Sequence, residues 1–469
     1  MLKVISGISI IFIVIGSLSI FPKEFNVNSN KQKKSNKLSL KDCIGIALEN
    51  NNKIKAAKED INIASARKKQ AESGYWPRLS LKSAYTIMDQ DPVFILPESR
   101  IDIPLNVPGL NINLNGVVVP EQDVKLLDRH NLHGELDLEY PLYTGGKVQS
   151  LNKQAELGYN IAKLETKKTS LEVKYNVICY YYAVVLTQKL YSIGKDAVAR
   201  LEATLSLTES LYKNGSGKVT KIDYLRNKVM VDQANNLLTE IKGKMKAARE
   251  ALRFVLGYQI PADFKITETE IPFADKVINI DSIVSSTYQY NPDWSKINSA
   301  EKVYKLKIDE ARSEYLPTIA LFGSLNENVN SYNYGMVNKA NKTLWTAGIG
   351  MELPIFSGFR TAGKVDEREA QLNKIQDQKQ LLHDAIALQI KNACNDVKIT
   401  GEQVEKILEA KNSAEENCSL NERAFQEDMV EAKDLIEAQI MESLVEAQYQ
   451  NALYKHFTAQ AKLNMLIGK

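Results

Sequence analysis

The sequence, 469 residues long, has few of the residues on which enzyme chemistry or a disulfide framework depends. Its four histidines stand at positions 130, 133, 383 and 456, and its four cysteines at 43, 179, 394 and 418. His130 and His133 are three residues apart in an expected strand and so face opposite sides of it. The cysteines have no paired spacing, which favours structural thiols. Because the sequence has no nucleophile–base pair, metal-ligand spacing or glycine-rich cofactor loop, we expect no enzyme activity, no cofactor and no metal site.

Long apolar runs are lacking after the N-terminus, and so is a basic surface. The run from Val4 to Phe21 predicts a secretory signal within residues 1–25, with an uncleaved membrane anchor as the alternative. A basic, polar leader follows at 26–37. Residues 1–37 carry six lysines and one glutamate, a charge of +5, whereas the whole chain carries +3, which leaves −2 for the remainder. We therefore expect export and no nucleic-acid partner.

Proline is also scarce, with 13 in the chain, which leaves room for long helices. Residues 147–211 contain no proline and would reach roughly 97 Å as a single helix. Residues 430–467 also predict a long helix, with a narrow apolar stripe and one solvent-exposed polar face. The stripe consists of Leu435, Ile436, Ile440, Leu444, Val445, Tyr449 and Leu453. A thin seam of this kind is typical of coiled coils rather than of globular core helices.

The sequence repeats its own plan. "EYPLYTGGK" at 139–147 corresponds to "ELPIFSGFR" at 352–360 with an offset of 213, and "SGYWPRLSL" at 73–81 corresponds to "SEYLPTIAL" at 313–321 with an offset of 240. We interpret this as an internal duplication.

The duplication divides the chain into a first repeat at 38–257, a linker at 258–280 and a second repeat at 281–469. Each repeat is expected to contain a helix, a β-hairpin and a long helical hairpin. The expected β-hairpins are 77–143 and 317–356, and the expected helical hairpins are 147–256 and 358–467.

The two β-hairpins differ in length. The offset falls from 240 to 213, so the first repeat carries 27 extra residues, within 89–129. Five prolines exclude a helix there. We expect a long ordered loop or ribbon.

The strands alternate with a period of two. In 132–140 the apolar Leu136 and Leu138 face one way, and Glu135, Asp137 and Glu139 face the other. Residues 79–87 and 345–353 show the same pattern. Two hairpins packed on a soluble core would explain it, but the aromatics at the strand ends suit the girdle of a lipid interface.

The repeated nonapeptide is interpreted as a strand-to-helix joint. Pro141 and Pro354 are expected to end the strands, and Gly145 and Gly358 to permit the bend before the long helices.

Four strands cannot close a barrel, and an open sheet edge cannot lie in lipid, so membranous strands would have to be pooled by several chains. With its duplicated plan, paired joints and tip sequences, the chain resembles the TolC family of outer-membrane efflux proteins over nearly its whole exported length. The resemblance implies a mainly α fold with a β-barrel part. A homotrimer would form a 12-stranded barrel in outer-membrane lipid and a long α-helical tunnel extending into the periplasm.

The resemblance also assigns candidate residues at the inner end of the tunnel. Asp434 and Glu437 match two acidic positions that form rings at the constriction, although a solvated helix face is the alternative. Phe425 and Tyr212 match aromatic positions, and Asp223 matches an acid of the first tip.

The turns at these tips depart from the family pattern. Gly215 and Gly217 would reverse the chain at the first tip, which has two additional residues. At the second tip, Asp428 stands where the family usually has glycine, and Val430 where some members have an arginine that locks the gate.

Within the barrel, Glu135, Asp137, Glu139 and Glu352 are candidates for the lumen, where they would favour cations. The resemblance implies a passive exit duct for efflux or type I secretion. Its partners would be an inner-membrane pump, of the RND or ABC type, and a periplasmic adaptor protein. The alternative is a periplasmic coiled-coil adaptor or scaffold anchored by its N-terminus.

Overall fold

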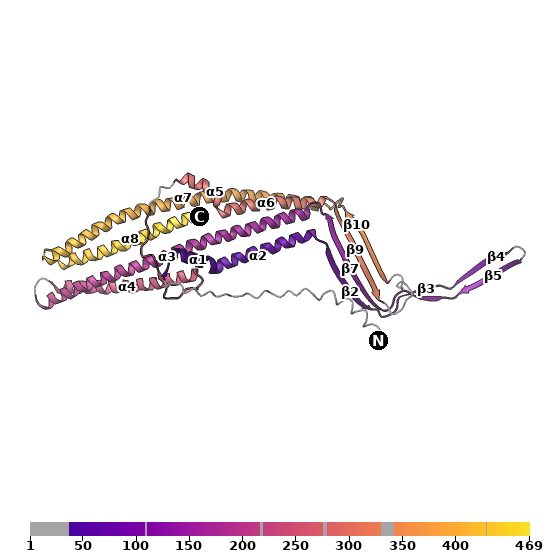
Figure 1. Cartoon of the computed structure of the whole chain (residues 1–469), viewed down its shortest axis with the longest axis horizontal. Coiled ribbons are helices and arrows are strands. Elements are labelled where there is room, and N and C mark those ends of the chain that lie inside the picture. Colours follow the sequence, from indigo (N-terminus) through magenta and orange to yellow (C-terminus); the bar gives the residue numbers. More distant parts are fainter. Residues whose placement is uncertain (1–36, 108–109, 216–218, 275–278, 330–341, 428) are drawn as a thin grey trace.

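The structure is a computed structural model that describes residues 37–107, 110–215, 219–274, 279–329, 342–427 and 429–469. The expected signal (1–25) and the leader up to residue 36 lie outside these ranges. The described chain is elongated: helices fill one end, a four-stranded sheet adjoins them, and a thin ribbon projects beyond the sheet (Figure 1). The predicted fold class, mainly helical with a strand part, is confirmed.

The helices occur as two sets of equal length. α1 and α5 each have 11 residues, α2 and α6 have 21, α3 and α7 have 67, and α4 and α8 have 35. The first set is α1 (Leu40–Asn50), α2 (Asn52–Glu72), α3 (Lys147–Lys213) and α4 (Lys221–Val255). The second set is α5 (Ile280–Tyr290), α6 (Pro292–Arg312), α7 (Arg360–Gln426) and α8 (Ala432–Leu466). At about 1.5 Å per residue, α3 and α7 are each roughly 100 Å long.

One asparagine in each set separates the first two helices and holds a third. Asn51 caps α2 by accepting a hydrogen bond from the backbone N–H of Lys53, and its side-chain amide donates to the carbonyl of Val255 at 2.7 Å. Asn291 caps α6 and donates to the carbonyl of Leu466 at 3.0 Å. Each asparagine therefore starts one helix and fixes the end of α4 or α8 beside it.

The long helices α3 and α7 have different neighbours along their length. Near the sheet α3 lies against α2 and α6, and towards the far end it lies against α4 and α8 (Figure 1). α7 packs on α6 and α8 in the same way. The largest apolar core lies midway, where Tyr181 of α3 and Leu252 of α4 pack with Phe264 beside the two-stranded pair of β1 (Lys37–Leu38) and β8 (Lys265–Ile266).

Four antiparallel strands form the sheet, in the order β10-β9-β7-β2. They are β2 (Arg78–Ile87), β7 (His130–Tyr143), β9 (Thr318–Val329) and β10 (Thr343–Glu352). β2 and β10 are the edges, and within the described part of the chain their outer sides have no partner strand.

The joints that follow β7 and β10 differ in detail. Gly145 (φ +63°) and Gly358 (φ +61°) adopt the left-handed conformation that favours glycine. β10 ends before Pro354, as expected, but the expectation that Pro141 ends its strand is wrong, because β7 continues to Tyr143. The register shifts between Pro141 and Tyr143, and a proline without an N–H is tolerated at such an irregularity.

The additional residues of the first repeat form two antiparallel ribbons. β3 (Val93–Leu96) pairs with β6 (Gln122–Lys125), and β4 (Ser99–Val107) pairs with β5 (Leu110–Val119). This agrees with the expectation of a non-helical ribbon, which projects from the outer end of the sheet (Figure 1).

Candidate functional site

The sheet has one apolar face that the described part of the chain leaves largely open. Leu136 of β7 lies opposite Leu81 of β2 and Leu325 of β9, and Leu325 lies opposite Trp345 of β10. Directly opposed residues share a face, so a single apolar surface crosses all four strands. Trp345 and Ile349 remain 73% and 69% exposed. An apolar surface of this extent requires a partner or lipid to cover it.

The opposite face of the sheet is polar. Glu135, Asp137 and Glu139 lie there as predicted, and Glu352 of β10 shares the face. Lys82 of β2 places its Nζ 2.7 Å from Asp137 Oδ2 and 3.6 Å from Glu135 Oε2. The lysine offsets part of the negative charge, a pairing that the alternation alone did not predict.

Two large apolar side chains, Phe322 and Leu344, interrupt the polar face. Phe322 lies in the same cross-strand row as Glu139 and Gly348. Its ring covers the two glycines of β10: a Cβ added at Gly348 would come within 2.7 Å of the ring, and one at Gly350 within 3.6 Å. The glycines therefore let the phenylalanine lie close to the sheet.

At the opposite end of the molecule, Asp223 caps its own helix. Its carboxylate accepts hydrogen bonds from the hydroxyl and the backbone N–H of Thr220 at 2.6 and 3.0 Å, and its N–H donates to the Thr220 hydroxyl at 3.3 Å. This reciprocal arrangement is a capping box. The hydrogen bond from the Thr220 hydroxyl, followed by the one from its backbone N–H, lowers the pKa of Asp223 below the usual aspartate value.

Asp434 has the corresponding position at the second tip. Its carboxylate accepts from the backbone N–H of Glu431 at 3.3 Å, at the start of α8. Glu437 is exposed and lies 3.9 Å from Lys433. Both acids thus have local partners, and both stand on the outer surface of the single chain.

The remaining tip candidates are placed as follows. Tyr212 stacks on Tyr224, with ring centroids 6.0 Å apart and an interplanar angle of 7°. Phe425 is half-buried near the end of α7. Gly215 has φ +64°, as a chain reversal requires. Gly217 and Asp428 lie outside the described residues.

A polar link between the two helical hairpins could not be predicted from the sequence. Arg200 of α3 places Nη1 2.5 Å from Glu442 Oε2 of α8, and Nη2 donates to the Ser443 hydroxyl at 3.2 Å. Beside it, Thr204 of α3 donates to Gln439 of α8 at 3.5 Å. Arg200 and Glu442 are far apart in the sequence and are brought together only by the packing of α3 on α8.

The same junction includes a buried thiol of α7. The Sγ of Cys418 lies 4.0 Å from Arg200 Nη1, and burial, the largest cause, raises the pKa of Cys418 to about 12. Its carboxylate neighbours act in the same direction. The thiol is therefore protonated at neutral pH and has a packing role at the meeting point of the three helices.

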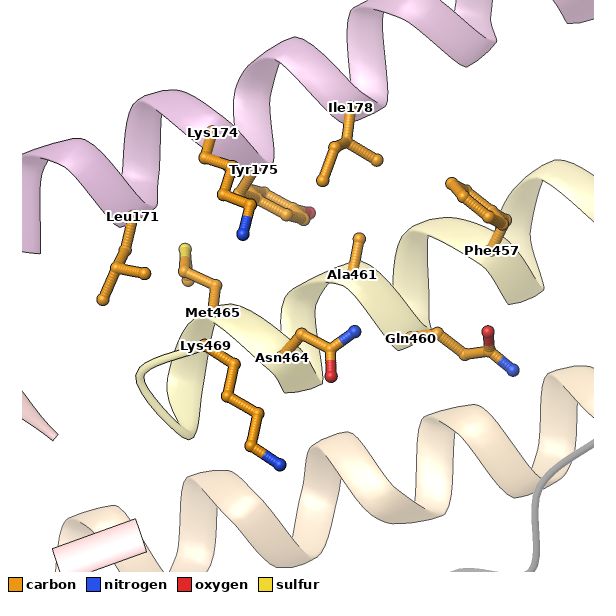
Figure 2. A pocket seen from close by; sticks show the side chains of 10 residues that line it. All are labelled: Leu171, Lys174, Tyr175, Ile178, Phe457, Gln460, Ala461, Asn464, Met465 and Lys469. Carbon is orange, nitrogen blue, oxygen red and sulfur yellow. The ribbon is translucent and has the colours of Figure 1, made fainter. Parts of the chain in front are cut away.

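The described residues contain no group of three or more histidine, cysteine or acidic side chains able to hold a metal ion. A groove of about 340 Å³ lies between α3 and the end of the chain, lined mainly by apolar side chains (Figure 2). Lys174 and Lys469 border it, and its lining includes no carboxylate or thiol. In the same described ranges, no helix combines the length and apolar character needed to cross a membrane.

Comparison with known proteins gives a family match over most of the chain. A family model described as "Outer membrane efflux protein" matches residues 43–258 and 283–469. Nodulation protein T of Rhizobium leguminosarum bv. trifolii is 23% identical over 341 residues, 71% of each chain. Probable outer membrane lipoprotein SilC of Salmonella typhimurium is 23% identical over 234 residues, about half of each chain at 48%.

Solved structures share the fold at low identity. The CmeC outer membrane channel of Campylobacter jejuni superposes with a TM-score of 0.73 at 16% identity, covering 92% of this chain and 85% of that one. The outer membrane protein VceC of Vibrio cholerae gives 0.71 at 16% identity, covering 92% and 96%. CusC gives 0.70 at 15% identity, covering 96% of both chains.

Proposed function

The chain belongs to the outer membrane efflux protein family, and we propose that three copies of it form a passive exit duct through the outer membrane and the periplasm. The four strands of each copy would contribute to one 12-stranded barrel. The long helical hairpins would form the periplasmic tunnel. This function uses both halves of the elongated molecule.

The observation that carries the proposal is the sheet with two open edges and one uncovered apolar face. In lipid, every backbone N–H and C=O must find a partner, so the edges β2 and β10 have to be paired. β2 and β10 run antiparallel when copies are placed side by side around a ring. Closure would put the apolar face against lipid and the polar face, with Lys82 and Asp137, around a water-filled lumen.

The lumen would carry a negative bias. Glu135, Asp137, Glu139 and Glu352 outnumber the two bases on that face, Arg78 and Lys82. Three copies would multiply the excess and favour cations.

The duct would work with an inner-membrane pump, of the RND or ABC type, and a periplasmic adaptor protein. Named relatives include a cation efflux system protein of Escherichia coli O157:H7 and a toluene efflux pump outer membrane protein of Pseudomonas putida. They are 19% and 22% identical to this chain. A passive conduit needs no catalytic site of its own.

The alternative, a periplasmic coiled-coil adaptor or scaffold anchored by its N-terminus, is disfavoured by the same sheet. An adaptor would bury the apolar face against its own core. Here Trp345 and Ile349 stay exposed although α3 and α7 are available in the same chain.

The test is to purify the full chain from outer membranes in detergent and to measure its mass and its ion conduction. We expect an oligomer of three chains that resists mild SDS, and cation-selective currents when it is inserted into a planar lipid bilayer. A monomer recovered in the soluble fraction, without currents, would contradict the proposal.

A further inference from the structure

From the first short helix to the end of the long helix, the two repeats are related by two constant offsets, 240 and 213, and these offsets also reproduce strand pairing. Leu81 lies opposite Leu136 in the first hairpin. Adding 240 to the first number and 213 to the second gives Leu321 and Ile349, which lie opposite each other in the second hairpin. The same shift converts the pair of Arg78 and Glu139 into that of Thr318 and Glu352. The repeats are therefore equivalent in register as well as in order.

The chain also contains a seam between the repeats, where β7 pairs with β9. Leu136 lies opposite Leu325, and Glu139 lies opposite Phe322. The equivalent seam would join β10 to a strand β2, but β2 of the same chain lies at the far edge of the sheet. Only a second copy can supply it.

We propose that β10 of one copy pairs with β2 of the next in the register of the internal seam, so that Ile349 lies opposite Tyr85 and Glu352 opposite Lys82. This inference rests on the proposed assembly and specifies its contact residues. The partner is a second copy of this chain, joined head to tail so that rotation closes the ring.

The chemical character of the paired residues supports this register independently of the comparison between the repeats. Ile349 and Tyr85 are both apolar and belong to the apolar face, and Glu352 and Lys82 carry opposite charges on the polar face. A shift by one residue would place the apolar sets of the two strands on opposite sides. A shift by two would place Glu352 opposite Ser80 or Ala84 and lose the charge pair.

The strand-to-helix joints beside the sheet support the same pairing of neighbouring copies through other residues. A Cβ added at Gly145 would lie 2.7 Å from the carbonyl oxygen of Ser313 and 2.8 Å from Leu316 Cβ, so the first joint fits closely against the second repeat. The counterparts are Gly358 on one copy and Ser73 and Trp76 on the next. Apart from Gly358 itself and its two chain neighbours, no described residue places an atom within 4 Å of a Cβ at Gly358, and Trp76 is 72% exposed.

The same equivalence predicts a contact between helices of neighbouring copies. Gln154 of α3 donates from Nε2 to Glu310 Oε2 of α6 at 2.8 Å. The offsets convert this pair into Glu367 of α7 and Gln70 of α2 on the next copy. The amide and the carboxylate exchange places, and their hydrogen bond is possible again.

Four cysteine substitutions test the register. Combined as Ile349→Cys with Tyr85→Cys, or Met351→Cys with Ser83→Cys, they are directly opposed in the proposed seam. Combined as Ile349→Cys with Ser83→Cys, or Met351→Cys with Tyr85→Cys, they are shifted by two residues. Diagonal neighbours are roughly 7–8 Å apart, beyond the usual Cα separation of a disulfide, so the opposed pairs should cross-link at least about tenfold faster.

The experiment is mild oxidation of the full chain in outer membranes, followed by a non-reducing denaturing gel. We expect cross-linked dimers and trimers from at least one opposed pair. Leu136→Cys with Leu325→Cys is the positive control, since it should form a disulfide within one chain without added mass. The wild type should show no cross-link, because Cys43, Cys394 and Cys418 are buried and the half-buried Cys179 lies in α3, outside the sheet.

The outcomes separate this inference from the proposed function. If the wild type is a trimer and the shifted pairs cross-link faster, or if the opposed pairs fail while the positive control succeeds, the register is wrong. If the wild type is a monomer, the proposed function as a trimeric exit duct is wrong.

Discussion

At the scale of single residues, the acids at the two helix tips are held by the helices they begin. The carboxylate of Asp223 accepts from both the hydroxyl and the backbone N–H of Thr220, whereas Asp434 accepts from the backbone N–H of Glu431. A carboxylate near a helix N-terminus is further stabilised by the helix dipole. These acids therefore order the tips, whether or not they also form rings in an assembly.

Replacing Asp223 by alanine removes the carboxylate half of the capping box and should loosen the first turn of α4 by about 0.3–1 kcal/mol, the usual contribution of an acid near a helix N-terminus. The folded-state pKa of Asp223 is lowered, so this stabilisation is fully present above the ordinary aspartate value near 3.9 and is lost as the pH falls through the folded-state value. Hydrogen exchange of the amides of residues 221–224, followed against pH, measures both effects. Asp232→Ala on the exposed side of α4 is the control and should change neither. Unchanged exchange in Asp223→Ala would show that the cap contributes nothing.

A second residue-scale prediction concerns the glycines under Phe322. Gly348→Ala should destabilise the sheet by about 1–3 kcal/mol, because the new Cβ would lie 2.7 Å from the ring and force it off the strand. Gly323→Ala is the matched control: it lies on the other face, with its nearest neighbours at 3.6 and 3.9 Å, and should be neutral or stabilising by about 0.4–1 kcal/mol. The temperature at which the detergent-solubilised oligomer dissociates compares the two. Equal temperatures would mean that the ring moves without cost.

At the scale of elements, the repeated motifs predicted most of the architecture, because hydrophobic period and proline position are local signals. The strand alternation at 132–140 and the proline-free stretch at 147–211 correspond to β7 and α3. Thr220 could also have been identified, since a threonine three residues before an acid is a capping pattern. The contact of Arg200 with Glu442 could not, because it depends on how α3 packs against α8. The prediction that Pro141 ends its strand is wrong for a similar reason, because only the pairing with β9 shows that β7 continues past it.

That interhelical contact gives the prediction at this scale. Arg200→Ala removes the ion pair and the Ser443 hydrogen bond and leaves the half-buried Glu442 without its partner, at a cost of about 1–2 kcal/mol for a partly exposed site. The two helical hairpins should then separate more readily near their tips, and the conductance of the channel in a planar bilayer should rise.

Lys213→Ala is the control for this experiment. It removes a base from the same helix whose partner, Glu209, lies on α3 itself at 2.7 Å, so it does not connect the hairpins. We expect wild-type conductance from it. If Arg200→Ala and Lys213→Ala conduct alike, the Arg200–Glu442 pair does not hold the tips together.

At the scale of the whole molecule, the two repeats carry equal helices but unequal β-hairpins. In the described part of the chain, the strands of the first repeat's ribbon pair only with one another: β3 pairs with β6 and β4 with β5, and neither pair joins the four-stranded sheet. Its base is closed by backbone hydrogen bonds from Leu126 to Pro92 and from Met88 to Arg129, both at 2.8 Å. The sheet and the joints are therefore complete without it.

Replacing residues 93–125 by Asn-Gly, a two-residue turn suited to an antiparallel hairpin, should leave assembly intact. Pro92 and Leu126 are already hydrogen-bonded neighbours, so the short turn spans the gap without moving β2 or β7. We expect the shortened chain to reach the outer membrane as an oligomer of wild-type stoichiometry, with a dissociation temperature within a few degrees of the wild type. The comparison variant keeps the ribbon but replaces Ile349 by lysine. This substitution puts a charge on the apolar face and should prevent stable insertion, because a lysine on the lipid face at the bilayer midplane costs about 2–4 kcal/mol per copy. Loss of the oligomer on removal of the ribbon would mean that the ribbon takes part in assembly. In that case, closing the sheet edges would not suffice to hold the copies together.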